Sequence, residues 1–577
     1  MKNLLLSIII LSGLFFASCQ PSTKKELPKQ TDSLSVNKEW QKLSVREKVG
    51  QLVCYQFNKN EMLQLGGGSY EQFFQKYPIG SIFLANWNIA GAVSADSVKN
   101  EYIKIVNQCK TASKNPLLFT EDFETGLGFV IDGYTQLVTE MGLGAIGSEE
   151  LAEQYGAIIA SEARSIGINW LLHPVADLNI NPYSYITNVR SIGKDPDLAI
   201  KLLPAQIKGM QTKGVAATAK HFPGDGTDFI NQHFSTSQNK LSVEEWNSTY
   251  GMIFQTFIND GVKVIMPGHI SFPAYQKEKL NDEFLPATLS SELIQGLLKD
   301  KMGFNGVVVS DALNMAGIAQ YYSSQIETEV ECFKAGTDIL LWPSLAVIDT
   351  IEARINRGEI TMSRLDDAVE RIWNLKAQLG LFEDDYQTII PLSDSLLEKH
   401  HQTAFEISKK ALTLISKKET DSPFLSPTDQ KILLVEVMQD YKEGVFDVLV
   451  NELKQRGMEV TVRRNLSYFE SGSELTNLAL EYDKIIFTYY SLPGVPWGDL
   501  SLSGREALTM WASNMLPKDK VISLGFGDPY KNIIYLPRIE TRINCYNIDS
   551  YSQRALAGAL LGDFELTGKS PVSYPEL

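Results

Sequence analysis

The sequence is poor in cysteine and has no recognisable metal-binding motif, which excludes two classes of protein. Only five cysteines occur among 577 residues, and no two of them stand at the close spacing of a zinc or redox motif. An H-E-x-x-H segment is also absent, so no metal site is predicted. We expect free, buried thiols and no disulfide framework.

Basic clusters are missing as well, and the charge balance is strongly acidic. The formal net charge is -16, and no window combines clustered lysine and arginine with aromatic residues. A nucleic-acid partner is therefore not expected, because phosphate binding needs a basic surface. Hydrophobic residues make up 44% of the chain and charged residues 21%, which is typical of globular proteins with a sizeable core. The length indicates two domains, one of them large. Nothing in the sequence assigns an oligomeric state.

The apolar run at the N-terminus, from Leu4 to Phe16, is too short for an ordinary membrane-spanning helix. It follows Lys2 and ends in small residues before Cys19, so residues 1–18 resemble a bacterial lipoprotein signal peptide. In that interpretation the Cys19 thiol is acylated, and the polar residues up to 39 form a flexible tether. The chain would then be anchored to a membrane of the bacterial cell envelope. A plain signal peptide or a buried helix is the alternative.

Short β-rich apolar runs alternate with helical stretches from residue 40 to residue 384, which is the pattern of βα units around a parallel sheet. There are eight such runs, at residues 49–57, 80–84, 117–120, 168–173, 215–220, 262–266, 306–310 and 337–341. Eight strands fit a closed (β/α)8 barrel better than an open doubly wound sheet. The acidic string 383–385 marks the expected start of a smaller C-terminal α/β domain, residues 385–577. Its expected strands lie at 431–437, 484–490, 520–525 and within 568–575.

Polar residues follow five of the eight expected barrel strands. They are Glu121 with Asp122, Asp177, His221, His269 and Asp311. Barrel active sites are built at the carboxyl ends of the strands, so we expect these side chains to converge on one rim. Any single one of them could simply terminate its strand, and the prediction depends on all five together.

Two of the strand ends carry groups suited to catalysis. Lys220 and His221 leave a strand together and can donate to sugar hydroxyls, and a Gly- and Pro-containing loop then leads to His233. Histidine suits general acid/base catalysis because its ordinary pKa lies near working pH. Asp311 follows a nearly all-apolar run and is well placed to attack an anomeric carbon. An incidental loop histidine and a helix-capping aspartate are the alternatives.

Six segments occur in an order that resembles glycoside hydrolase family 3, and particularly its β-N-acetylhexosaminidase branch. They are residues 47–52, 174–177, 188–191, 220–224, 286–290 and 310–315. The resemblance covers residues 43–381 and continues more weakly beyond them. It implies a retaining hydrolase that needs no cofactor and releases terminal β-linked N-acetylhexosamine, with N-acetylglucosamine favoured.

The resemblance also implies a role for each matching residue. Asp311 would be the nucleophile that forms a covalent glycosyl-enzyme intermediate, and His233 the acid/base. Four residues would hold the hydroxyls of the sugar, His269 would contact or shape the same pocket, and Asp177 would have a supporting role. The four are Asp122, Arg190, Lys220 and His221.

Two departures from the family pattern keep other functions open. The branch usually carries an aspartate two residues before the acid/base histidine, where this chain has Asn231. A common Asp-x-Glu-Gly-Gly-Arg segment ends here in Leu127, without the arginine. Another β-glycosidase specificity, glycosyl transfer to an acceptor such as phosphate, and a sugar-binding lipoprotein with weakened catalysis are the alternatives.

Overall fold

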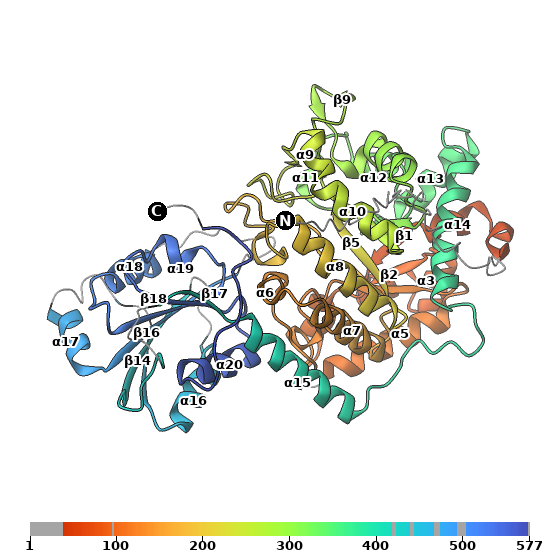
Figure 1. The fold of residues 1–577 in the computed structure, drawn as a ribbon. Coiled ribbons are helices and arrows are strands. Elements are labelled where there is room, and N and C mark those ends of the chain that lie inside the picture. Colours follow the sequence, from red (N-terminus) through yellow and green to blue (C-terminus); the bar gives the residue numbers. More distant parts are fainter. Residues whose placement is uncertain are drawn as a thin grey trace, which may run out of the picture.

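The structure is a computed structural model that describes residues 38–94, 97–417, 423–438, 443–464, 466, 473–492 and 504–574. Two lobes follow each other along the chain (Figure 1), and helix α15 (Asp394–Ala411) runs between them. Cys19 and most of the predicted tether lie outside the described residues, so the lipid anchor stays a prediction. Within the described ranges, no helix is both long enough and apolar enough to cross a bilayer.

The first lobe is the predicted barrel, with one strand at each of the eight expected regions, although β3, β5 and β7 extend one or two residues past the predicted ends. The strands are β1 (Val53–Gln56), β2 (Ser81–Phe83), β3 (Leu118–Glu121), β4 (Trp170–Leu171), β5 (Ala216–Phe222), β7 (Val264–Pro267), β11 (Val307–Val308) and β12 (Leu340–Leu341). They are parallel in the order β11-β7-β5-β4-β3-β2-β1-β12, and a parallel bridge between Val309 and Ile339 joins the two ends. The (β/α)8 fold is confirmed.

The prediction of a strand from residue 49 was wrong at its start, because residues 49–51 belong to helix α1 (Val45–Gln51). Ser44 and Glu47 form a reciprocal capping box that starts this helix, and the strand begins only at Val53. An apolar run of this length does not show by itself where a buried helix ends and a buried strand begins.

Helices surround the barrel and cover its apolar strands (Figure 1). The main ones are α2 (Lys59–Leu65), α3 (Tyr70–Lys76), α4 (Asn86–Ile89), α5 (Val98–Ala112), α6 (Glu140–Ile146), α7 (Glu149–Ser165), α8 (Pro196–Gln211), α9 (Val243–Asn247), α10 (Tyr250–Asn259), η7 (Glu292–Lys301), α11 (Ala316–Ala319), α12 (Gln325–Lys334), α13 (Ala346–Asn356) and α14 (Met362–Gln378). Two short β-pairs lie in the loops, β6 (Ser237–Gln238) with β8 (Ile270–Ser271) and β9 (Lys279–Leu280) with β10 (Glu283–Phe284).

The second lobe is a six-stranded sheet in the order β13-β18-β17-β16-β14-β15, with only β13 antiparallel to its neighbour. Its strands are β13 (Thr413–Ser416), β14 (Lys431–Met438), β15 (Glu459–Arg464), β16 (Lys484–Ser491), β17 (Val521–Gly527) and β18 (Thr541–Asn544). Its helices are α16 (Asp447–Gln455), α17 (Ser473–Glu481), α18 (Gly504–Ser513), α19 (Lys531–Ile534) and α20 (Ser550–Leu560). The strand expected within 568–575 is reduced, among the described residues, to one bridge between Thr413 and Gly568.

Helix α15 contacts both lobes. Ala404 and Ile407 belong to the barrel core, whereas Phe405 on the same helix packs against the core of the second lobe. His400 Nδ1 donates to the buried Glu162 carboxylate of α7 at 3.0 Å. The predicted domain boundary at residue 385 stays a prediction.

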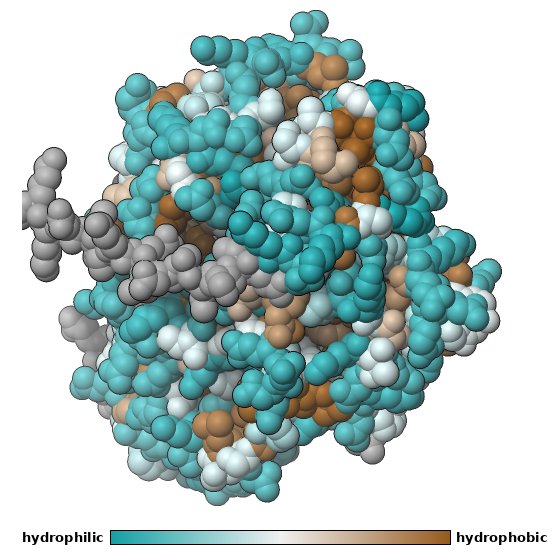
Figure 2. Space-filling view, turned by 90° about the vertical axis from the view of Figure 1, so that its right-hand side faces the viewer, coloured by the Kyte–Doolittle hydropathy of each residue, from teal (hydrophilic) through white to brown (hydrophobic). Residues whose placement is uncertain are grey.

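The face drawn in Figure 2 is mostly hydrophilic, and its apolar side chains form small, separate patches.

Candidate active site

The predicted site residues of the barrel lie at the carboxyl ends of its strands. Asp122 follows β3 directly, and Asp311 comes three residues after β11. Lys220 and His221 are among the last three residues of β5. His269 follows β7 in the same way. Parallel strands end at the same rim of a barrel, so these side chains share one face of the molecule.

His221 is held between two carboxylates. Its Nδ1 donates to Asp177 Oδ2 at 2.7 Å, and the opposite Nε2 lies 3.9 Å from Asp311 Oδ2. Asp177 is almost fully buried, and its second oxygen accepts the backbone N–H groups of His221 and Asp225. Asp177 therefore fixes the ring of His221 so that Nε2 faces Asp311.

Asp311 is a buried carboxylate that its surroundings keep ionised. Burial alone would raise the pKa of the Asp311 carboxyl, but the positive character of His221 and His269 and the N–H of Ala312 together lower it. The Ala312 N–H donates to Asp311 Oδ1 at 2.7 Å. The side chain retains some exposure, 9% for the residue, at the open end of the barrel. A carboxylate of this kind is a competent nucleophile.

His269 lies behind Asp311 and has no exposed atoms. Its Nε2 donates to the Ala312 carbonyl at 3.0 Å, and its Nδ1 lies 2.7 Å from the hydroxyl of Thr288. Because both ring nitrogens are engaged within the protein, this geometry suits shaping of the pocket and leaves no ring nitrogen for direct contact with a sugar.

Glu124 forms a cluster with three other charged side chains, although it was not among the predicted site residues. Arg190 donates to both Glu124 oxygens, at 2.9 and 2.7 Å. Lys220 Nζ lies 2.9 Å from Glu124 and donates to Asp122 at 2.7 Å. Asp122 is the most exposed of the four, with 42% of its side chain accessible, so the cluster opens to solvent through Asp122.

Glu124 keeps its negative charge because of these two cations. Burial would raise the pKa of the Glu124 carboxyl, but Arg190 and Lys220 outweigh it and hold the pKa well below its usual value. The sequence did contain a signal for Glu124, since it is the glutamate of the same segment that contains Asp122. Nothing in the sequence alone shows that this glutamate, and not Asp122, is the centre of the cluster.

We expect Glu124→Gln to lower both stability and activity. The amide no longer neutralises Arg190 and Lys220, so removing the charge is expected to cost about 2–3 kcal/mol of unfolding free energy. The kcat/KM is expected to fall by about 10²-fold, because the cluster loses its geometry. Urea unfolding and steady-state kinetics on the purified variant measure the two effects.

Glu153→Gln is the matched control for this prediction. Glu153 on α7 forms an exposed ion pair with Lys208 at 2.7 Å, and such pairs contribute at most about 1 kcal/mol. Equal losses of stability in the two variants would contradict the central position of Glu124.

His233 reaches the site on a loop that is fixed at both sides. Its carbonyl accepts the N–H of Ala316 at 3.1 Å, and the neighbouring Gln232 side chain accepts the N–H of His269 at 2.8 Å. Gly317 permits this close approach, since a Cβ there would stand 2.1 Å from the Gln232 carbonyl oxygen. The loop of His233 therefore lies directly against the segment that follows Asp311.

Asn231 orients the imidazole of His233. Its Oδ1 accepts both the backbone N–H of His233 at 3.0 Å and the ring Nδ1–H at 2.8 Å, while its amide donates to the Tyr185 hydroxyl. Burial and, less strongly, Arg190 lower the pKa of His233 to about 4, although Asp311 opposes the change. At neutral pH the ring is uncharged, with its proton on Nδ1 and a lone pair on Nε2.

Two nearby aspartates do not replace a carboxylate at position 231. Asp228 Oδ1 is bound by Lys240 Nζ at 2.9 Å and by the N–H of Phe229, and Asp225 Oδ1 accepts from Ser237 and from Gly226. Neither carboxylate contacts His233 among the hydrogen bonds of the described residues. Burial, together with the neighbouring Asp177, raises the pKa of Asp225 to about 7. The possibility that one of them serves as the helper of His233 has no support in this geometry.

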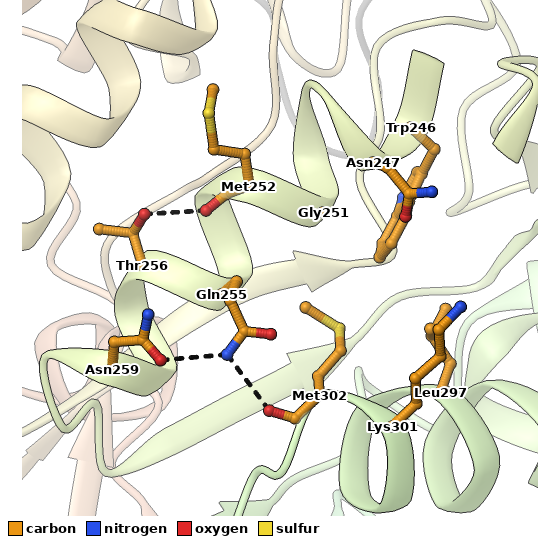
Figure 3. A pocket seen from close by; sticks show the side chains of 10 residues that line it. All are labelled: Trp246, Asn247, Gly251, Met252, Gln255, Thr256, Asn259, Leu297, Lys301 and Met302. Atoms are coloured by element: carbon orange, nitrogen blue, oxygen red, sulfur yellow. Dashed lines mark hydrogen bonds between the residues drawn. The ribbon is translucent and has the colours of Figure 1, made fainter. Parts of the chain in front are cut away.

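A separate groove of about 500 Å³ lies outside the barrel, between α9, α10 and η7. In Figure 3 the Gln255 side chain of α10 points toward Met302, and its Nε2 donates to Asn259 Oδ1 at 3.1 Å and to the Met302 carbonyl at 3.3 Å. None of the predicted site residues lines this groove.

A (β/α)8 barrel that presents a buried, ionised carboxylate, an imidazole and a cluster of charged side chains at its carboxyl rim has the architecture of a glycoside hydrolase. The chain belongs to glycosyl hydrolase family 3, because residues 44–375 match the N-terminal domain of that family. The family assignment from the sequence is confirmed.

The relatives match either nearly the whole chain or about half of it. A beta-N-acetylglucosaminidase/beta-glucosidase of Cellulomonas fimi is 29% identical over 557 residues, which are 91% of this chain and 93% of the relative. Beta-hexosaminidase A of Pseudoalteromonas piscicida is 31% identical, and its match spans 52% of this chain and 51% of the relative.

Two solved structures share the complete two-lobed fold. A beta-glucoside phosphorylase, BglX, bound to 2FGlc superposes with a TM-score of 0.81 at 29% identity and covers 93% of this chain and 96% of its own. A family 3 beta-N-acetylglucosaminidase from Paenibacillus sp. str. FPU-7 superposes with a TM-score of 0.77 at 27% identity, covering 92% and 99%.

Proposed function

We propose that this enzyme is a retaining β-N-acetylhexosaminidase that removes terminal N-acetylglucosamine, with Asp311 as nucleophile and His233 as acid/base. The observation that carries the proposal is the Asp177–His221–Asp311 arrangement, which keeps a buried carboxylate ionised at the barrel rim. Two of the relatives described above are named for N-acetylglucosaminide cleavage, which supports this choice of sugar.

In the first step, Asp311 attacks the anomeric carbon while protonated His233 gives its Nε2 proton to the aglycone oxygen, which leaves as an alcohol, so that a covalent glycosyl ester forms. Asp122, Arg190 and Lys220 would hold the sugar hydroxyls during this step, with Glu124 keeping the two cations in place. In the second step, a water molecule gives a proton to His233 Nε2 and attacks the same carbon, which releases Asp311.

A panel of 4-nitrophenyl β-glycosides tests the proposal on the wild-type protein. We expect the N-acetylglucosaminide to be cleaved faster than the glucoside, with the β-anomer of the free sugar appearing first by NMR. Preferred cleavage of the glucoside contradicts the choice of sugar, initial release of the α-anomer contradicts retention, and no cleavage of any glycoside leaves a sugar-binding role.

The state of His233 also favours a second candidate, transfer of the sugar to phosphate. A neutral imidazole beside Asn231 offers no carboxylate charge against an incoming anion, and BglX, a structural neighbour, is named as a beta-glucoside phosphorylase. Phosphate added to the assay separates the two reactions: formation of a glycosyl 1-phosphate supports transfer, whereas free sugar as the only product supports hydrolysis.

We expect Asn231→Asp to shift the alkaline limb of the kcat/KM–pH profile to higher pH. A carboxylate beside Nδ1 favours the imidazolium, so the pKa of His233, now about 4, should rise toward or above the ordinary 6.5. Protonated His233 then persists at neutral pH, and kcat/KM for alkyl glycosides at pH 6–7 should increase about tenfold. The pH profile of kcat/KM measures the shift.

Asn107→Asp adds the same charge on the exposed face of α5 and should leave the profile unchanged. In Asn231→Asp, the Tyr185 hydroxyl can rotate to donate to the new carboxylate, so that variant needs no other rearrangement. An unaltered profile in Asn231→Asp would show that His233 does not supply the proton.

We further propose that the enzyme works at the bacterial cell envelope, tethered by a lipid on Cys19. The support is the short apolar run that ends before Cys19 and the polar stretch that follows it. Labelling of the expressed full chain with a fatty-acid probe, compared with Cys19→Ala, tests this: label in both proteins would contradict acylation at Cys19.

A further inference from the structure

The loop that carries Arg190 is held by hydrogen bonds and apolar contacts with the C-terminal lobe. Asn188, two residues before Arg190, has no exposed atoms, and its amide donates to Asp528 Oδ2 at 3.2 Å. The next residue, Val189, packs into a small apolar cluster with Tyr530, Tyr546 and other residues of both lobes. Two residues that precede Arg190 are thus fixed by the second lobe, while Arg190 itself extends into the site.

Asp528 is built to hold Asn188. It follows β17, and its Oδ1 accepts the backbone N–H groups of Tyr530 at 2.7 Å and Lys531 at 3.1 Å, which leaves Oδ2 for Asn188. Asn188 adopts a positive φ of 21°, in a region that non-glycine residues rarely occupy. Its Oδ1 accepts the N–H of Val189 at 2.9 Å, so the side chain of Asn188 ties the loop to itself and to Asp528.

A second chain of hydrogen bonds runs in parallel from Tyr530. The Tyr530 hydroxyl donates to Asn179 Oδ1, and the Asn179 amide donates to Thr187 Oγ1 at 3.3 Å. The Thr187 carbonyl then accepts the backbone N–H of Arg190 at 2.8 Å. All three intermediate groups are buried, where hydrogen bonds are least exchanged with water.

The far end of the loop is fixed in the same way. Lys194 N–H donates to the Pro571 carbonyl at 3.2 Å, and a Cβ on Gly193 would stand 2.6 Å from that oxygen. The second lobe therefore holds the loop on both sides of Arg190, and only the Arg190 guanidinium, paired with Glu124, faces the site.

We propose that the C-terminal lobe sets the position of Arg190 in the sugar-binding cluster, with Asp528 and Tyr530 as positioning residues. This inference rests on the proposed contact of Arg190 with the sugar. Neither Asp528 nor Tyr530 touches the substrate; each acts through the backbone that presents Arg190. The arrangement gives the second lobe a part in catalysis although it contributes no nucleophile or base.

A double-mutant cycle in the full-length chain tests the proposal. Asp528→Asn turns an amide toward the Asn188 amide and removes that bond, whereas Tyr530→Phe removes only the hydroxyl. Each variant is made alone and together with Arg190→Ala, and kcat and KM are measured on the 4-nitrophenyl glycoside that the wild type cleaves best. Asp483→Asn is the control, because Asp483 also accepts two backbone N–H groups of this lobe but lies at the amino end of β16.

Coupling to Arg190 distinguishes positioning from general destabilisation. We expect Asp528→Asn and Tyr530→Phe each to lower kcat/KM by about tenfold in the wild-type background and not at all in the Arg190→Ala background. Asp483→Asn should change kcat/KM less than about twofold in either background. Thermal unfolding identifies the temperature at which every variant is folded, and the kinetics are run below it.

The other outcomes overturn different statements. If the effects of Asp528→Asn and Arg190→Ala multiply, or if Asp528→Asn resembles Asp483→Asn, the positioning role is wrong while the proposed function stands. If Arg190→Ala itself retains wild-type kcat/KM, the proposed sugar contact of Arg190 is wrong, and the positioning role falls with it.

Discussion

Replacing Asp311 with asparagine is expected to reduce kcat on every β-glycoside by about 10⁴-fold or more, because the other carboxylates that the structure describes at the site are held by cations or by His221 and are not free to form the glycosyl ester. Asp177 is committed to His221, and Glu124 is committed to Arg190 and Lys220. The isosteric amide still accepts the Ala312 N–H, so the fold should be preserved. Steady-state kinetics and thermal unfolding measure the two quantities separately.

Azide makes this prediction specific for a nucleophile. In Asp311→Gly, azide can occupy the space of the missing carboxylate and attack the anomeric carbon of an activated aryl glycoside. The aryl oxide leaves from the opposite face, so the product is an α-glycosyl azide. Asp349→Asn, which removes an exposed carboxylate that pairs with Arg46, is the control and should retain full activity. A rate in Asp311→Asn within tenfold of the wild type would exclude Asp311 as the nucleophile.

The sequence predicted the barrel well because its strands are short apolar runs, five of which are followed by a polar residue. Val307 and Val308 are buried on all sides, and Asp311 appears where the chain reaches the rim. The C-terminal lobe was predicted less completely. Strands β13, β15 and β18 lie at or near the edges of the sheet, where alternation with polar residues such as Glu459 and Arg463 weakens the apolar pattern.

Contacts across the chain could not be predicted from the sequence in the same way. Glu124 and Arg190 are 66 positions apart, and Asn188 and Asp528 are 340 positions apart, so no local pattern relates them. The sequence did identify Asn231 as a departure from the family pattern. Only the structure shows that Asn231 still orients His233 through the same oxygen that a carboxylate would offer, without supplying its charge.

His233→Ala is the second variant for which we expect a large loss of activity. Its effect should depend on the substrate, because Asn231 orients His233 without supplying the charge that would keep it protonated. With a pKa of about 4, only about one His233 in a thousand is protonated at pH 7, so the acid form needed in the first step is scarce, whereas the unprotonated form needed in the second step is almost fully populated. An activated dinitrophenyl glycoside needs no acid in the first step. We therefore expect kcat to fall by about 10²–10⁴-fold with this substrate while kcat/KM stays nearly unchanged.

Azide again decides the assignment, now with the opposite stereochemistry. It attacks the glycosyl ester on Asp311 without needing a base, so it should restore the turnover of His233→Ala. The product should be the β-glycosyl azide, the opposite anomer to the product of Asp311→Gly. Asn231→Ala serves as the matched variant, since it removes the contact to Nδ1 but leaves the imidazole in place. If kcat and kcat/KM fall together in His233→Ala and azide restores neither, His233 binds or shapes the pocket and another group moves the proton.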